Sequence, residues 1–151
     1  MKPIVNNGPY GIYAIAEVPV EFFDIDTMRV VWHGNYFKYF ESARRALLDK
    51  LDYDYGQMEE SGYAFPIVET SAKYIASLKS NDTAVVKAVL IEYENRLKMQ
   101  FEIKSLKTGQ ITTKGSSTQM AFDLNKMESC FLCPKILFDK VEALLGANID
   151  K

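Results

Sequence analysis

Two aspartates followed by the only histidine of the chain carry the most chemistry in this sequence. Asp24 and Asp26 end a strand-like run, and a short apolar segment then leads to His33, which opens a long helical pattern. The first turn of a helix has unpaired backbone N–H groups, and these can stabilise a developing oxyanion. A carboxylate just before such a turn could attack an acyl carbon or activate water. The pattern therefore points to acyl chemistry between Asp24 and His33.

The same residues also have a structural interpretation. Acidic residues before a helix commonly cap it or form a turn, so Asp24 and Asp26 could serve only that purpose. Taken without the residues that follow, this interpretation is the better one. His33 could likewise be a half-buried histidine with satisfied hydrogen bonds, and we expect its backbone N–H to matter more than its ring.

The elements that hold these residues follow from the pattern of apolar side chains. Residues 12–23 are rich in branched and aromatic side chains and predict a strand, with Pro19 indicating an edge or a bulge. Residues 34–51 predict a helix that begins at Gly34 or Asn35 and whose apolar arc is wider than that of a surface helix, so it should be largely buried. Glu41 and Arg44 form an i,i+3 pair within or beside that arc.

The remainder of the chain predicts a short helix, several strands and a final helix. The short helix covers 55–60, four strands cover 65–76, 84–93, 96–105 and 110–123, and the last helix runs from Pro134 to a C-cap at Gly146. Short loops between the strands predict an antiparallel meander, covered on its apolar face by helix 34–51. The fold class is thus α+β. We expect a single domain over residues 1–151, with a core over about 12–124 and a C-terminal helix over about 134–146.

Composition argues against several classes of function. The 151 residues are 48% apolar and 25% charged with a net charge of −2 and no basic run, so nucleic acid is a poor candidate partner. No apolar stretch is long enough for a membrane span, and the N-terminus has no secretory h-region. Two cysteines, Cys130 and Cys133, suit a reduced, cytoplasmic compartment. Their C-x-x-C spacing lacks a βαβ context, and with one histidine they make a poor zinc set, so we expect neither redox nor metal chemistry.

The segment from Phe22 to Arg44 resembles the 4-hydroxybenzoyl-CoA thioesterase family of hot-dog acyl-CoA thioesterases. The resemblance is carried by Asp24-Ile25-Asp26, by Val30-Val31-Trp32-His33-Gly34-Asn35-Tyr36 and by Tyr39-Phe40-Glu41-Ser42-Ala43-Arg44. Within the family the pattern is closest to the branch associated with the Tol-Pal gene cluster. It implies a hot-dog fold, in which a curved antiparallel sheet wraps round a long central helix. It also implies hydrolysis of an acyl-CoA thioester to a free acid and CoA, with no cofactor beyond the CoA of the substrate.

The resemblance further implies roles for individual positions. Asp26 matches the catalytic carboxylate, acting as nucleophile or general base, so this motif favours Asp26 as catalytic and Asp24 as structural. His33 matches the helix-start residue whose backbone N–H polarises the thioester carbonyl, with the N–H of Gly34 as a neighbour. Tyr36 matches an aromatic packing position. Active sites in the family lie between two subunits, so a homodimer or homotetramer is implied.

One position departs from the family pattern. The family usually has a glycine before the Val-Val pair, where it serves a positive φ or a close approach of substrate, and here the residue is Arg29. Arg29 could narrow the acyl pocket or contact a substrate carboxylate or a CoA phosphate. Trp32, Tyr36 and Glu69 are further candidates for substrate contact, although an outward, solvated position suits Glu69 equally well. Cations for the CoA phosphates could come from Arg96, Lys98, Lys104, Lys107 and Lys114.

Two other functions stay open on the sequence alone. A hot-dog hydratase or dehydratase would need an acid–base pair, commonly a histidine with an acid from the central helix or the facing subunit. The lone histidine lies in the thioesterase-type motif instead. A non-catalytic module that binds acyl thioesters stays open because of Arg29, since fold does not fix function. A thioester carried on acyl-carrier protein would be a variant of the main hypothesis.

Overall fold

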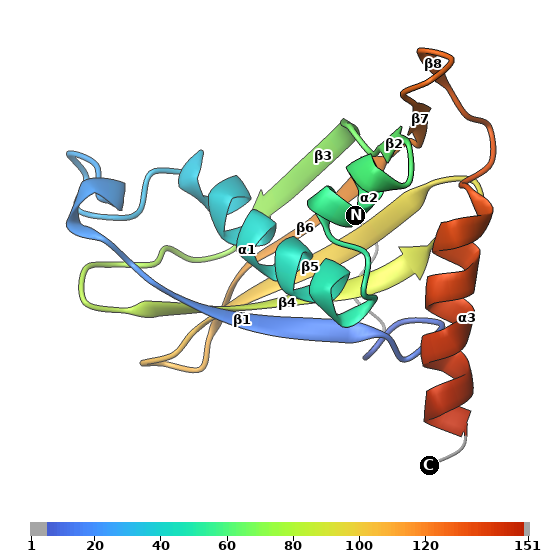
Figure 1. Ribbon diagram of the computed structural model, residues 1–151. Helices are drawn as coiled ribbons and strands as arrows, with labels where there is room; N and C mark the ends of the chain where they lie inside the picture. Colours follow the sequence, from blue (N-terminus) through green and yellow to red (C-terminus); the bar gives the residue numbers. More distant parts are fainter. Residues whose placement is uncertain (1–5, 150–151) are drawn as a thin grey trace.

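The computed structural model describes residues 6–149 and contains one main antiparallel sheet with a long helix packed against it (Figure 1). In chain order the elements are β1 (Tyr13–Pro19), the 3-10 turn η1 (Phe22–Asp24), α1 (Asn35–Lys50), α2 (Tyr55–Glu60), β2 (Tyr63–Ala64), β3 (Ile67–Tyr74), β4 (Thr83–Glu92), β5 (Leu97–Ser105), β6 (Ile111–Gln119), β7 (Phe122–Asp123), β8 (Glu128–Ser129) and α3 (Lys135–Ile149). The predicted helices and long strands are all present, with shifts of a few residues at their ends. This confirms the α+β class.

The order of the strands corrects the predicted meander. The five-stranded sheet has the order β1-β4-β5-β6-β3, so β4, β5 and β6 form a meander but β3 pairs with β6 at the far edge. The chain between β3 and β4, residues 75–82, is longer than a tight hairpin loop. It runs from β3 at one edge of the sheet to β4, which lies next to the opposite edge strand β1. Loop length alone does not reveal that crossing, because strand pairing is decided by tertiary packing.

The core lies between α1 and the face of the sheet that it covers. Buried residues of α1 pack on β1, β4 and β5, and alternate residues of β5 are fully buried as the sequence predicts. The ring of Phe40 stacks on Phe101 with ring centroids 4.7 Å apart. Gly115 of β6 permits this contact, since an added Cβ would collide with the Phe40 ring. The long helix α1 is therefore held by close packing on the middle of the sheet.

The buried side chain of Arg44 ties α1 to β6. Arg44 is 3% exposed and pairs with Glu41, as the i,i+3 spacing predicts, while its Nη2 donates to Ser117 Oγ at 2.9 Å. Tyr55 of α2 donates its hydroxyl proton to Glu41 at 2.6 Å. Burial lowers the pKa of Arg44, and its contacts with the Glu41 carboxylate and the Ser117 hydroxyl offset part of the cost of burying the charge. These contacts give Glu41 and Arg44 a structural role.

Two predicted boundaries were wrong. Residues 22–24 form η1 rather than the end of a strand, because the Asp24 carboxylate accepts the Glu21 N–H and closes a tight turn. Gly146 does not cap α3, which continues to Ile149. A glycine C-cap needs a positive φ, and Gly146 is not among the glycines that have one. In Figure 1, α3 stands at the end of the sheet opposite to the start of α1.

Candidate active site

Asp24 is a buried structural anchor. Its Oδ2 accepts hydrogen bonds from the Glu21 N–H at 3.0 Å and the Tyr39 hydroxyl at 2.8 Å, and its Oδ1 accepts one from Lys38 Nζ at 2.5 Å. Burial by itself raises the pKa of Asp24, but the bonds from Lys38, Glu21 and Tyr39 outweigh it and the net pKa is lowered. Asp24 is therefore ionised and fully engaged, as the structural interpretation expects.

The backbone of Asp24 also holds the start of α1. Its carbonyl oxygen accepts the Trp32 N–H at 2.9 Å and the Asn35 side-chain amide at 3.0 Å. Its carboxylate meanwhile bonds Lys38 and Tyr39, one turn further along the helix. One residue thus fixes the loop before α1 and the first two turns of the helix in a single arrangement.

Asp26 lies in a tight loop between η1 and α1. Its N–H donates to the Val30 carbonyl at 2.9 Å, its carbonyl accepts the Arg29 N–H at 3.0 Å, and its Oδ1 accepts the Met28 N–H at 2.8 Å. The residue is half-buried, and Oδ2 has no hydrogen-bond partner among residues 6–149. One carboxylate oxygen thus stabilises the turn, as the capping interpretation predicts, while the other is available for chemistry.

The charge of Asp26 also acts on the first turn of α1. Burial is the largest cause of the raised pKa of Tyr36, and the negative charges of Tyr74 and Asp26 raise that pKa further. The loop is also joined to the residues before α1 directly, because Ile25 forms a β-bridge with Val31 and the Asp26 N–H donates to the Val30 carbonyl.

Arg29 has a left-handed backbone conformation, with φ at +66°. That conformation costs a residue with a Cβ about 1–2 kcal/mol, and glycine adopts it without this penalty. Of the two reasons for a glycine that the sequence leaves open, the structure shows the positive φ, and Arg29 adopts it in spite of its Cβ. The Arg29 side chain is exposed at the tip of the loop that contains Asp26.

Residues 32–35 form what we call the helix-start turn. The Asn35 N–H donates to the Trp32 carbonyl at 2.9 Å and Gly34 is the N-cap, whereas the N–H groups of His33 and Gly34 have no partner in the part of the chain that the structure describes. An added Cβ at Gly34 would collide with the Trp32 ring, so only glycine fits beneath that side chain. Two backbone donors are thus free at the positively polarised end of α1.

Residues 74–78, which begin with the last residue of β3, hold this turn from the other side. Tyr74 donates its hydroxyl proton to the His33 carbonyl at 2.7 Å. The Leu78 N–H donates to the Tyr36 hydroxyl at 3.0 Å, and the Leu78 carbonyl accepts the Val31 N–H at 2.9 Å. In Figure 1 the arrowhead of β3 lies beside the first turns of α1. Sequence reasoning missed Tyr74, whose only signal was an aromatic residue near the end of a predicted edge strand.

The other candidates for substrate contact have different surroundings. Trp32 is half exposed beside the helix-start turn, while Tyr36 is 2% exposed and packs as the resemblance implies. Thr70 pairs with Ser117, whose side chain contacts α1, so Thr70 lies on the face of the sheet that α1 covers. Successive side chains of a strand alternate between faces, so the neighbouring Glu69 projects from the opposite face, where it is exposed. Within one chain the structure does not bring Glu69 to Asp26.

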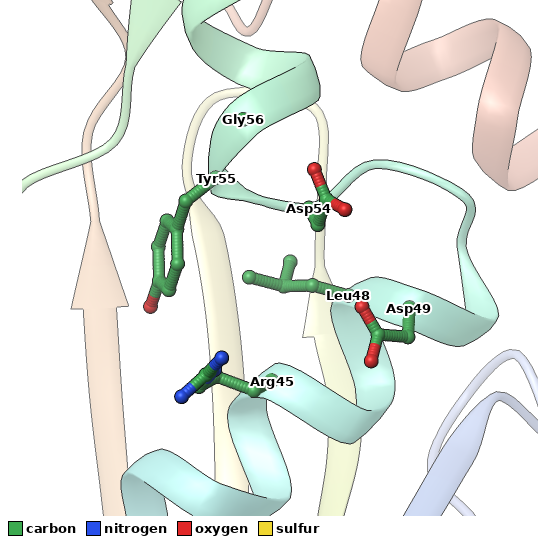
Figure 2. A pocket seen from close by; sticks show the side chains of 6 residues that line it. All are labelled: Arg45, Leu48, Asp49, Asp54, Tyr55 and Gly56. Carbon is green, nitrogen blue, oxygen red and sulfur yellow. The ribbon is translucent and has the colours of Figure 1, made fainter.

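Three cavities lie away from Asp26. One of about 240 Å³ between α1 and α2 is lined by Arg45, Leu48, Asp49, Asp54, Tyr55 and Gly56 (Figure 2). A second of about 250 Å³ includes Lys79 and Lys107, and a third of about 480 Å³ includes Arg96 and Phe131. Two of the predicted CoA-contacting cations therefore line cavities, and none of these three cavities includes Asp26 or His33.

The cysteines show no sign of a reactive pair. Cys133 is buried, and burial, with smaller contributions from Glu92 and Cys130, raises the pKa of its thiol to about 12. A reactive thiol needs the opposite shift. Over residues 6–149, three or more His, Cys, Asp or Glu side chains nowhere gather as a metal site requires. No helix in the same range has the length and apolar character to span a membrane.

Comparisons with known proteins agree on one family. Residues 20–140 match the model of the thioesterase-like superfamily. The chain is 30% identical over 108 residues to YneP of Bacillus subtilis, a candidate acyl-CoA thioesterase, with 71% of this chain and 78% of that protein covered. It is 33% identical over 95 residues to a candidate esterase of Synechocystis sp., covering 62% of this chain and 57% of that protein. A DHNA-CoA thioesterase from Staphylococcus aureus superposes with a TM-score of 0.75 at 28% identity, covering 92% of this chain and 95% of that one.

Proposed function

Because the chain belongs to the thioesterase-like superfamily, we propose that it hydrolyses acyl-CoA thioesters to a free acid and CoA. The observation that carries this proposal is that a carboxylate with one unbonded oxygen and two unbonded backbone N–H groups lie on the same short segment between η1 and α1. Asp26 has an oxygen without a partner, and the His33 and Gly34 N–H groups are free among the described residues. Such a pair supplies both functions that thioester hydrolysis requires.

The chemistry needs an oxygen nucleophile and a place for negative charge. The thioester carbonyl oxygen would accept hydrogen bonds from the His33 and Gly34 N–H groups, which become stronger as that oxygen turns into an oxyanion. Asp26 would then act in one of two ways. As a nucleophile it attacks the thioester carbon, expels the CoA thiolate and forms a mixed anhydride that water hydrolyses. As a general base it takes a proton from a water that attacks the same carbon, and the resulting tetrahedral intermediate expels the CoA thiolate to leave the free acid.

A second copy of the chain is part of the proposal. Strand β3 is an edge of the sheet, and its apolar side chains Ile67 and Val68 are about half exposed, at 46% and 53%. An exposed, apolar edge strand favours pairing with another strand. Pairing of β3 edges in a homodimer, or a homotetramer built from it, would set the partner's surface beside Asp26 and complete an acyl pocket.

A screen for thiol release tests the activity. Short, long, branched and aromatic acyl-CoAs are mixed with the protein, and the liberated CoA thiol is detected with a thiol-reactive dye. We expect turnover of at least one class, its loss in Asp26→Asn, and retained binding of the same acyl-CoA by that variant. The S. aureus relative makes aromatic acyl-CoAs the first compounds to try. Comparison with an acyl-carrier-protein thioester then identifies the preferred carrier.

The same screen separates the alternatives. Tight binding of acyl-CoAs with no thiol release would select the non-catalytic binding module. Water addition to an enoyl-CoA without thiol release would select the hydratase. Hydrolysis by this mechanism needs only water and protein groups, so exhaustive dialysis against a chelator should leave turnover unchanged. We also propose a cytoplasmic location, from the two cysteines Cys130 and Cys133, and membership of the Tol-Pal-associated branch, from the motif between Phe22 and Arg44.

A further inference from the structure

The Tyr74 hydroxyl makes one hydrogen bond, and it reaches the helix-start turn. Tyr74 is the last residue of β3 and is 43% exposed. Its hydroxyl donates to the His33 carbonyl oxygen at 2.7 Å. Its ring contacts the His33 ring edge-on, with centroids 6.2 Å apart, and the Tyr36 ring in the same way at 5.2 Å. A residue distant in sequence thus touches the peptide group that begins α1.

That hydrogen bond acts on one of the two free donors. The His33 carbonyl and the Gly34 N–H belong to the same peptide group. A proton donated to the carbonyl oxygen draws electron density from the amide nitrogen, so the N–H at the other end becomes a stronger donor. The Gly34 N–H has no acceptor of its own in residues 6–149, so a thioester oxygen would receive the whole effect.

The same bond also fixes the direction of that N–H. The Trp32 N–H and the Asn35 side chain bind the Asp24 carbonyl on one side of the turn, and Tyr74 binds the His33 carbonyl on the other. Gly34 has no Cβ to restrict its own peptide planes. The orientation of the 33–34 peptide group therefore depends on these outside contacts.

We propose that Tyr74 is a positioning residue for the thioester oxyanion, which it strengthens and aims through the 33–34 peptide group. This inference rests on the proposed thioesterase function. Tyr74 itself stays out of contact with the reacting atoms. The neighbouring Tyr36 differs, because its hydroxyl accepts the Leu78 N–H and so supports the segment behind the turn.

Tyr74→Phe tests the role, since it removes the hydroxyl and keeps the ring contacts with His33 and Tyr36. Loss of a whole oxyanion donor costs about 10²–10³-fold in kcat, and a neighbouring hydrogen bond changes donor strength by roughly 10–30%. We therefore expect kcat to fall about two- to eightfold with KM nearly unchanged. Tyr55→Phe is the matched control: Tyr55 is 41% exposed and its hydroxyl also donates one short bond, to the Glu41 side chain further along α1 and away from the His33 peptide group.

The carbonyl stretch of a bound acyl-CoA provides the decisive reading. An acyl-CoA labelled with ¹³C at the thioester carbonyl is bound to Asp26→Asn, which holds the substrate without turnover, and its infrared band is compared with that in water. We expect the band to move to lower frequency on binding, and to recover part of that shift when Tyr74→Phe is added but not when Tyr55→Phe is added. A merely structural tyrosine would leave the band in place.

Failure of the inference and failure of the proposed function give different results. A shifted band that is identical with and without Tyr74→Phe would overturn the role of Tyr74 and leave the oxyanion turn intact. A band that does not move on binding to Asp26→Asn would overturn the turn as the oxyanion site, and the role of Tyr74 with it. An equal loss of kcat in Tyr74→Phe and Tyr55→Phe would assign both effects to general stability.

Discussion

Asp24 and Asp26 are separated by one residue, yet they occupy opposite environments. Asp24 is 2% exposed and its carboxylate receives three hydrogen bonds from the protein, while Asp26 is half-buried and receives one. Both are acidic residues placed before a helix. The difference shows that the Asp24 carboxylate supports the geometry of the loop, whereas the Asp26 carboxylate keeps one oxygen available for chemistry.

The division of roles follows from the turn that connects them. The Asp24 carbonyl pairs with Trp32 and the Asp26 N–H pairs with Val30, so the chain folds back on itself and Ile25 bridges Val31. Asp24 then faces the helix side, where Lys38 and Tyr39 meet it. Asp26 bonds only within the loop, through Oδ1 to the Met28 N–H, and its Oδ2 has no hydrogen-bond partner among the described residues.

The largest expected effect is on the rate of the two Asp→Asn variants. Asp26→Asn removes the nucleophile or base and should lower kcat by about 10²–10⁴-fold. Its melting temperature should stay close to that of the parent, because only one local turn bond is affected. Steady-state thiol release and a thermal melt measure both. If Asp24→Asn abolished turnover as completely while keeping its fold, the assignment of roles would be reversed.

The next effect concerns stability, on which Asp24→Asn should have a larger effect than Asp26→Asn. Asp24→Asn replaces a buried carboxylate that accepts three bonds, and should lower the free energy of unfolding at pH 7 by about 1–3 kcal/mol. Urea titration of the parent, Asp24→Asn and Asp26→Asn measures these differences in the free energy of unfolding. Equal stability of Asp24→Asn and the parent would contradict the anchor role.

The difference in stability between the parent and Asp24→Asn should depend on pH with a defined sign. The folded-state pKa of Asp24 is lowered, so its stabilisation is complete above its unfolded pKa of about 3.9 and is lost as the pH falls through the lower, folded value. The difference in stability between the parent and Asp24→Asn should therefore stay constant near neutrality and shrink below about pH 4. Urea titrations at several acidic pH values check this.

A smaller effect concerns the loop that separates the two aspartates. Arg29→Gly should raise the free energy of unfolding by about 0.5–1 kcal/mol, because glycine tolerates the +66° φ and loses some of the gain to chain entropy. Arg29→Ala is the control, since it removes the side chain but keeps the strained Cβ. A rise in KM common to both variants would show that the Arg29 side chain binds substrate. Stabilisation by Ala equal to that by Gly would refute the backbone explanation.

The smallest expected effect is that of His33→Ala. The His33 side chain is exposed, and the proposed role belongs to its backbone N–H, so kcat should change by no more than about threefold. Thiol release measured across pH 5–8 also detects any imidazole titration. A loss as large as that of Asp26→Asn would make the ring catalytic and revive the acid–base pair of a hydratase.

Local sequence was sufficient where contacts are short-range. The α1 helix, the Glu41–Arg44 pair and the buried alternation of β5 all follow from spacing within a few residues. Each depends on a periodicity or a backbone preference that operates without knowledge of the rest of the chain. The roles of Asp26, His33 and Gly34 stay predictions, now supported by where the turn places them.

What only the tertiary structure decided was which distant segments meet. Pairing of β3 with β6 instead of β4, and the arrival of Tyr74 and Leu78 at the start of α1, join residues some forty positions apart. Such contacts depend on the burial of the whole sheet against α1. Many side chains contribute to the free energy of this burial, and no single motif encodes it. For that reason the sequence determined the residues able to do chemistry, and the packed fold decided which of the two aspartates is left free to do it.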